Sequence, residues 1–171
     1  MSGTLSNNGA TSHWYTGNDT SDLGRWAWTR LSWKDKNITI ISAYRPYKSF
    51  TGGVHTVYAQ HTRYLLVHQE PWQHFLVDLK AHIQTHQDKG DIIILGMDLK
   101  DPAQRYDITK NFDELNMKEE IQSIHIGQRL LATNILNESE YPIDEICYSI
   151  VLTVQIVGYS NFGKGNSIIE P

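Results

Sequence analysis

The sequence predicts a mixed α/β (α+β) domain, and three observations support this fold class. Short runs of β-branched and aromatic residues recur along the chain, amphipathic stretches with helical spacing separate them, and Gly, Pro and Asn mark the boundaries. With 171 residues, the chain has room for one domain with a genuine core. Its composition, 40% hydrophobic and 20% charged, is that of a soluble globular protein.

The first strands are expected after a polar start. Residues 1–24 are rich in Ser, Thr, Asn and Gly, so we expect loop there and treat 1–22 as a flexible N-terminal segment. Residues 26–33 alternate large and small side chains, and residues 38–45 are rich in β-branched residues. Turn residues separate the two runs, which predicts an antiparallel hairpin that ends at Pro46.

Two helices and a buried strand are expected next. The first helix covers about residues 56–68. The second begins at Pro71, a favourable first-turn residue, and ends before Gly90. Its apolar residues follow helical spacing: Phe75, Leu76, Leu79 and Ile83. Residues 91–96 follow as a strand with four aliphatic residues in a row.

The last third of the chain is expected to add one helix and one or two strands. Residues 112–125 have the pattern of an amphipathic helix, and residues 143–159 are rich in β-branched and aromatic residues. The predicted domain therefore runs over residues 23–160, and residues 161–171 form a C-terminal tail.

Charge and cysteine content limit the classes of function. A net charge of −4 and a pI near 6.0 give no overall attraction to nucleic acid or anionic membranes, so nucleic-acid contact requires a local basic patch. The single cysteine, Cys147, excludes an internal disulfide and suits a reducing compartment. The polar start does not resemble a signal peptide, and no apolar run is long enough for a membrane span. We therefore expect an intracellular protein, nuclear or cytoplasmic, with no membrane partner.

Acidic residues lie at the ends of two of the expected strands, and a tyrosine ends a third. The aliphatic run that ends at Leu95 is followed by Asp98, Lys100 and Asp101. Carboxylates at the exit of a buried strand either form a solvated turn or present metal ligands at one edge of the core. Asp144 lies among aliphatic residues at the start of another strand, which is unusual unless a positive group meets it. Tyr44 ends the second strand of the hairpin.

Three motifs together resemble the metal-dependent endonuclease/exonuclease/phosphatase superfamily: IISAYRP, DIIILGMD and PIDEICYS. Their order and spacing agree with that family over residues 23–160. The stretch LGRWAWTRLSW is most similar to the endonuclease domains encoded by retrotransposon-like mobile elements. The resemblance implies a partial four-layered α/β sandwich, with two mainly antiparallel sheets packed face to face and helices outside.

The resemblance also implies roles for individual residues. Tyr44 matches a tyrosine at the phosphate site, Asp98 an aspartate that activates water or holds the metal, and Asp144 a metal ligand or a residue behind it. The implied chemistry is hydrolysis of a nucleic-acid phosphodiester, with DNA as the expected partner and Mg²⁺ or Mn²⁺ as the cofactor. A hard cation offsets charge on the phosphoryl oxygens while a carboxylate positions the attacking water.

Neighbouring basic residues are candidates for phosphate contact. Arg45 and Lys48 lie beside Tyr44, and Lys100 lies two residues after Asp98. The family has an asparagine at the position of Lys100. An ammonium can contact phosphate as a point charge, but it cannot accept a hydrogen bond from water.

Other departures from the family pattern predict an impaired enzyme. The family ends in an Asp-His pair that the stretch 158–171 lacks. We also expect that the family's N-terminal strands, with their metal-binding glutamate, are missing. The isolated chain is therefore predicted to be weak or inactive. The alternative is a non-catalytic remnant of the fold that binds nucleic acid or a protein partner.

Histidines and tryptophans suggest two further sites. His82 and His86 are spaced i, i+4 on the second helix, which is compatible with a zinc site or with solvated polar positions. Trp26, Trp28 and Trp33 are candidates for stacking with bases, although their alternation favours packing within a sheet.

Overall fold

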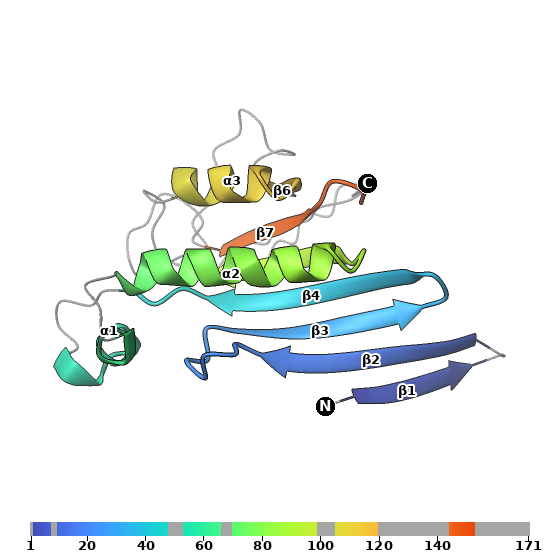
Figure 1. Ribbon diagram of the computed structural model, residues 1–171, viewed down its shortest axis with the longest axis horizontal. Helices are drawn as coiled ribbons and strands as arrows, with labels where there is room; N and C mark the ends of the chain where they lie inside the picture. Colours follow the sequence, from blue (N-terminus) through green and yellow to red (C-terminus); the bar gives the residue numbers. More distant parts are fainter. Residues whose placement is uncertain are drawn as a thin grey trace, which may run out of the picture.

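A computed structural model describes six segments of the chain: residues 2–7, 10–47, 53–65, 70–98, 105–119 and 144–152. They form one seven-stranded mixed sheet with strand order β1-β2-β3-β4-β5-β7-β6, together with several helices (Figure 1). The predicted α+β class is confirmed. The described residues contain this one sheet, so the second sheet of the expected sandwich is not among them.

Four strands follow one another in antiparallel order at the start of the chain: β1 (Ser2–Asn7), β2 (Ala10–Asn18), β3 (Trp26–Trp33) and β4 (Lys36–Tyr44). The predicted hairpin is therefore confirmed as β3 and β4. Lys34 adopts a positive φ of 55° in the tight turn between these two strands.

The expectation of loop over residues 1–24 was wrong for β1 and β2. Cross-strand packing explains how these weak strand formers pair, because two glycines accommodate tryptophan rings from the neighbouring strand. A Cβ built on Gly3 would lie 2.3 Å from the ring of its register partner Trp14. A Cβ on Gly17 would lie 2.6 Å from Trp28 in the same way. These rings shield the glycine backbone and compensate for the missing side chains.

A helical connection joins β4 to the next strand. The 3₁₀ turn η1 (Gly53–His55) and helix α1 (Val57–Leu65) precede helix α2 (Pro71–Gln87), and strand β5 (Ile92–Asp98) then pairs in parallel with β4. The predicted second helix and its stop are confirmed, since Gly90 has a φ of 78° that suits glycine at a helix end.

The last described elements differ from the expected helix over 112–125. Helix α3 (Arg105–Asp113) ends early, and β6 (Met117–Glu119) is a strand that pairs with β7 (Asp144–Ser149). The backbone turns at Asn116, which has a φ of 52°, and the following Met117 is buried in the core.

Three predicted stretches lie outside the described residues: 120–125, the later part of the expected strand region 143–159, and the tail 161–171. No helix among the described residues has the length and apolarity to cross a bilayer.

The core lies between one face of the sheet and the two helices α2 and α3. Phe75, Leu79 and Ile83 from α2 pack with Ile93 and Leu95 of β5 in one buried cluster. Figure 1 shows α2 running nearly parallel to the axis of strand β4. Only alternate residues of the aliphatic run point into this core. Ile93 and Leu95 are fully buried, whereas Ile92 and Ile94 lie on the other face of the sheet and are half-buried.

We predict that Ile93→Asp prevents folding. Ile93 has no exposed surface, and an unpaired buried carboxylate costs several kcal/mol against a typical total stability of about 5–15 kcal/mol. Ile40→Asp is the matched control, because Ile40 lies on the opposite face of the neighbouring strand and is 42% exposed. Circular dichroism and urea unfolding should show a folded control. A cooperative transition in the Ile93 variant would contradict the core placement.

Candidate functional site

The three residues expected to form the site lie in one row at one edge of the sheet. Strands β4 and β5 are parallel and end together, and the antiparallel strand β7 begins at the same edge. As a result Tyr44 is the register partner of Asp98, and Asp98 is the register partner of Asp144. Adjacent strands are about 4.8 Å apart, so the backbone brings these three positions within the reach of one small ligand.

Backbone hydrogen bonds fix the strand ends at this row. The amide of Tyr44 donates to the carbonyl oxygen of Arg25 at 2.8 Å, and the amide of Arg45 donates to the carbonyl oxygen of Asp98 at 3.3 Å. The side chain of Tyr44 is 39% exposed. Asp98 is half-buried, and its Oδ1 atom is enclosed. The row therefore combines a solvent-accessible phenol with a partly enclosed carboxylate.

Of the three basic residues expected to contact phosphate, the structure describes Arg45. Arg45 is only 3% exposed, and the Cζ atom of its guanidinium lies 3.8 Å from the centroid of the Trp72 ring. This cation–π contact joins the end of β4 to the first turn of α2. Arg45 is thus buried at the margin of the core, and its expected contact with phosphate stays a prediction. Lys48 and Lys100 lie outside the described residues.

Metal-binding groups are sparse in the described part of the chain. Among the described residues, no three or more His, Cys, Asp or Glu side chains form a group that would hold a metal ion. The rings of His82 and His86 meet edge to face, with centroids 4.9 Å apart, and both lie against Trp28 on the sheet. The two histidines are therefore packed between helix and sheet, and the interpretation as solvated polar positions was wrong.

A polar cluster that the sequence reading did not identify surrounds His86. Arg30 binds Asp91 through two hydrogen bonds of 2.6 and 2.7 Å. Thr39 donates to the same carboxylate at 2.9 Å, and Nδ1 of His86 lies 2.9 Å from it. Asp91, Thr39 and His86 are buried, so this cluster connects β3, β4, α2 and the start of β5 beneath the surface. The alternation of residues 26–33 already indicated that Arg30 shares a face with Trp26 and Trp28.

A second buried ion pair anchors the segment before β3. The guanidinium of Arg25 binds Asp19 at 2.6 and 3.0 Å and reaches Asp78 of α2 at 2.7 Å. Burial by itself would raise the pKa of Asp19, but hydrogen bonds from Arg25 and Ser21 outweigh it and lower the pKa to about 2. Removing either partner would leave an uncompensated buried charge.

The tryptophans divide between the two faces of the sheet. Trp26 is buried, and its ring packs against Phe75 and His82 under α2. Trp28 packs beside it, so the packing interpretation is confirmed for both residues. Trp33 lies on the other face, is 55% exposed, and has the Nζ atom of Lys34 at 4.8 Å from its ring centroid.

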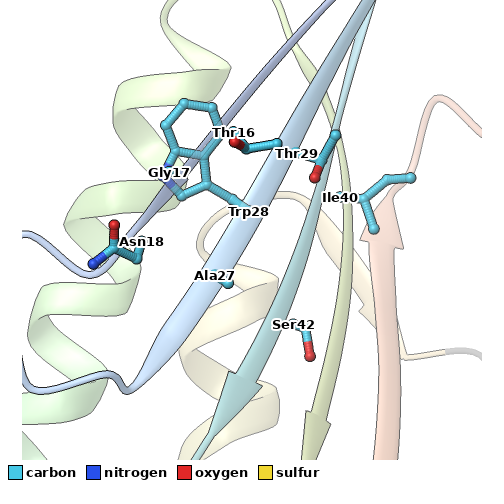
Figure 2. A pocket seen from close by; sticks show the side chains of 8 residues that line it. All are labelled: Thr16, Gly17, Asn18, Ala27, Trp28, Thr29, Ile40 and Ser42. Carbon is cyan, nitrogen blue, oxygen red and sulfur yellow. The ribbon is translucent and has the colours of Figure 1, made fainter. Parts of the chain in front are cut away.

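A shallow hollow of about 510 Å³ lies on strands β2, β3 and β4, and its lining does not include Tyr44 or Asp98. Figure 2 shows the side chains that line it: Thr16, Gly17, Asn18, Ala27, Trp28, Thr29, Ile40 and Ser42. The lining contains no titratable group and thus offers no acid, base or charged ligand for catalysis.

A distant structural similarity comes from the comparisons with known proteins. No model of a known protein family matches the chain, and no curated protein matches it. Among solved structures, the human Nocturnin catalytic domain with bound sulfate anion is similar over 88% of this chain, with a TM-score of 0.41 and 14% sequence identity. The chain spans 47% of that structure's length. A similarity this distant transfers no residue role or activity.

We predict that His82 makes the folded state less stable as the pH falls from 6.5 towards 4. Burial and, to a smaller extent, the nearby His86 together lower the pKa of His82 to about 4, so the unfolded chain binds a proton first. This difference corresponds to at most about 3 kcal/mol of the free energy of unfolding. Urea titrations at pH 7 and pH 5 measure the loss.

The variant His82→Gln separates this effect from other titrations. Its free energy of unfolding should depend less on pH between 7 and 5 than that of the unmodified chain. Asp19 does not change the free energy of unfolding between pH 7 and pH 5. The stability that its carboxylate contributes is lost only as the pH falls below 3.8. Identical pH dependence in the two proteins would show that His82 is not held neutral.

Proposed function

We propose that this chain is a phosphodiester-hydrolase-type domain of the endonuclease/exonuclease/phosphatase kind, derived from a mobile element and acting on nucleic acid. Its site would be the row of Tyr44, Asp98 and Asp144, and its activity in the isolated chain would be weak or absent. The observation that supports this proposal best is the register of β4, β5 and β7, which brings three motifs from distant parts of the sequence to one edge.

The residues of this row have chemistry suited to phosphate. A carboxylate at Asp98 can orient and deprotonate a water molecule, and the phenol of Tyr44 can donate a hydrogen bond to a phosphoryl oxygen. Tyr44 is accessible enough for such a contact. Asp98 is partly enclosed, so water screens the charge of its carboxylate less than it would screen a fully exposed charge.

Asp98 and Asp144 are also the residues that would hold Mg²⁺ or Mn²⁺. Two carboxylates at adjacent register positions offer the oxygen donors that Mg²⁺ takes when water and substrate phosphate complete its coordination. When bound, the ion would neutralise charge on the phosphoryl oxygens. Asp98 would then have a second task, since its partly enclosed carboxylate would also fix the position of the ion.

Weak activity follows from what surrounds the row. Lys100 provides a positive charge two residues after Asp98, where the resembling family has an asparagine, and it would oppose a bound cation. Arg45, the described basic residue next to Tyr44, is committed to Trp72. The electrostatic groups that stabilise a phosphoryl transition state are thus depleted, and each such group is typically worth about 10²–10³ in rate.

We predict negligible cleavage of nicked, abasic or single-stranded DNA by the purified chain with Mg²⁺ or Mn²⁺. Lys100→Asn alone should not restore activity, because a single polar group does not replace the other missing electrostatic groups. A fluorescent-oligonucleotide assay over several hours, with a metal-chelator control, measures this. Metal-dependent cleavage that disappears in Asp98→Ala would overturn the prediction of inactivity and establish a working enzyme.

We predict that the row nevertheless retains weak affinity for Mn²⁺. Asp98→Asn should lower that affinity by at least about tenfold, because it removes a charged oxygen donor. Asp35→Asn is the matched control, since Asp35 is exposed in the turn at the opposite end of β4. Mn²⁺ titration followed by electron paramagnetic resonance reports free metal directly. Equal effects of the two variants would argue for the non-catalytic remnant that binds a partner without metal.

A further inference from the structure

Helix α1 is held on the rest of the protein by few contacts. Within Val57–Leu65, which the structure describes in full, His61 is the one buried residue, with 3% of its surface exposed. Tyr64 is 58% exposed, and the hydroxyl of Tyr58 donates to the carboxylate of Glu70 in an exposed contact of 3.4 Å. The docking of α1 therefore depends largely on one imidazole ring.

The ring of His61 binds the segment that precedes β3. Its Nε2 atom lies 3.2 Å from the backbone carbonyl oxygen of Leu23. A carbonyl oxygen only accepts hydrogen bonds, so Nε2 carries a proton and donates it. The other ring nitrogen, Nδ1, is enclosed and has no hydrogen-bond partner among the described residues. An enclosed nitrogen without an acceptor favours the neutral ring, in which Nδ1 carries no proton.

The charged groups that face His61 come from the segment before β3 and, behind it, from α2. Arg25 and Asp19 both act on the ring through space. Arg25 binds Asp19 and reaches Asp78 on α2, and Nδ1 of His74 lies 2.8 Å from the same Asp78 carboxylate. Burial of the ring lowers the pKa of His61, and the charge of Arg25 lowers it further. The hydrogen bond to the backbone carbonyl and the charge of Asp19 act in the opposite direction without reversing the shift.

This contact lies beside the row of the candidate site. Leu23 is joined to Arg25 by Gly24, which has a positive φ of 67°. The carbonyl oxygen of Arg25 accepts a hydrogen bond of 2.8 Å from the amide of Tyr44. Figure 1 shows α1 at the end of the sheet where β4 finishes. By holding Leu23, α1 thus supports the short segment that fixes the end of β4.

We propose that His61 is a pH-sensitive latch, which holds α1 on the segment before β3 when neutral and, when protonated, releases α1 and loosens the backbone at Tyr44. Protonation adds an enclosed N–H group without an acceptor, and it places a positive charge near the guanidinium of Arg25. Little apolar packing opposes release, and an isolated helix of nine residues is marginal in water. The latch is a property of the fold and does not depend on hydrolysis at the row.

The direction of the pKa shift determines the sign of the pH dependence. The pKa of His61 is lower in the docked state than the ordinary 6.5, so docking is most stable above pH 6.5 and weakens as the pH falls. If the ring takes up its proton only after release, the equilibrium constant for release rises by up to about 25-fold between pH 7 and pH 5. Asp19 keeps its charge throughout this range, because its pKa is about 2.

Hydrogen exchange followed by NMR tests the latch through the backbone amides of residues 61–65. Their protection factors, corrected for the intrinsic pH dependence of exchange, should fall by about 5- to 25-fold between pH 7 and pH 5. The protection factor of the Tyr44 amide should fall with them. His61→Gln should abolish this fall and keep the protection at pH 7, because its side-chain amide can still donate to Leu23 and does not titrate. His61→Ala should give low protection at both pH values.

Two comparisons isolate the effect of His61. His55→Gln is the matched control, because His55 is an exposed histidine two residues before α1, and the pH dependence of residues 61–65 should remain in this variant. The amides of α2 report larger openings, to which the titration of His82 contributes. Their pH dependence should be the same in His61→Gln and in the unmodified chain.

A titration of the ring nitrogens of His61 by NMR provides a check that needs no variant. The folded chain should give a pKa below 6.5, with the proton on Nε2 at pH 7. A pKa at or above 6.5 would overturn the proposal. Protection of residues 61–65 that stays constant from pH 7 to pH 5, or that falls equally in His61→Gln, would overturn it as well. A Tyr44 amide that stays protected while α1 opens would exclude the link to the row.

Discussion

Helix α2 returns the chain from the end of β4 to the start of β5, so these two strands pair in parallel and finish at the same edge. The parallel pair can form only if α2 packs on the sheet, because the crossover must span the length of both strands. The burial of Phe75, Leu79 and Ile83 supplies that packing. The position of Tyr44 beside Asp98 therefore depends on a hydrophobic contact made on the other side of the sheet.

Buried polar groups define how α2 lies on the sheet. Arg25 reaches Asp78 on the helix, and His86 reaches Asp91 just after it, so charge-assisted contacts hold both the middle and the end of α2. Apolar packing is not directional, whereas these hydrogen bonds require one geometry. They also make α2 sensitive to single substitutions, because a lost partner leaves a buried charge. At the first turn of the helix, Arg45 and Trp72 add a third contact.

Much of the fold could be predicted from local patterns, and the candidate site required long-range information. Strong periodicity and clear stops such as Gly90 made three parts of the fold predictable: the hairpin of β3 and β4, helix α2 and strand β5. Strands β1 and β2 have the composition of loops, because their pairing rests on tryptophan–glycine contacts across strands, which the local sequence does not reveal. The helix expected at 112–125 ended at Asp113 because Met117 is drawn into the core as part of a strand. For the site, three motifs indicated Tyr44, Asp98 and Asp144, but the roles of Arg30 and Asp91 depend on neighbours distant in sequence.

The cluster around Asp91 has a consequence for the order in which the protein folds. Its carboxylate binds His86, Thr39 and Arg30, which are 5, 52 and 61 residues away along the chain. Closing the shortest loop has the smallest entropic cost, so the end of α2 and the start of β5 should form a local unit before the hairpin docks. The hairpin then arrives with Thr39 and Arg30 already adjacent across β3 and β4. One buried carboxylate would thus report the docking of the hairpin, since its last two hydrogen bonds form only when that docking is complete.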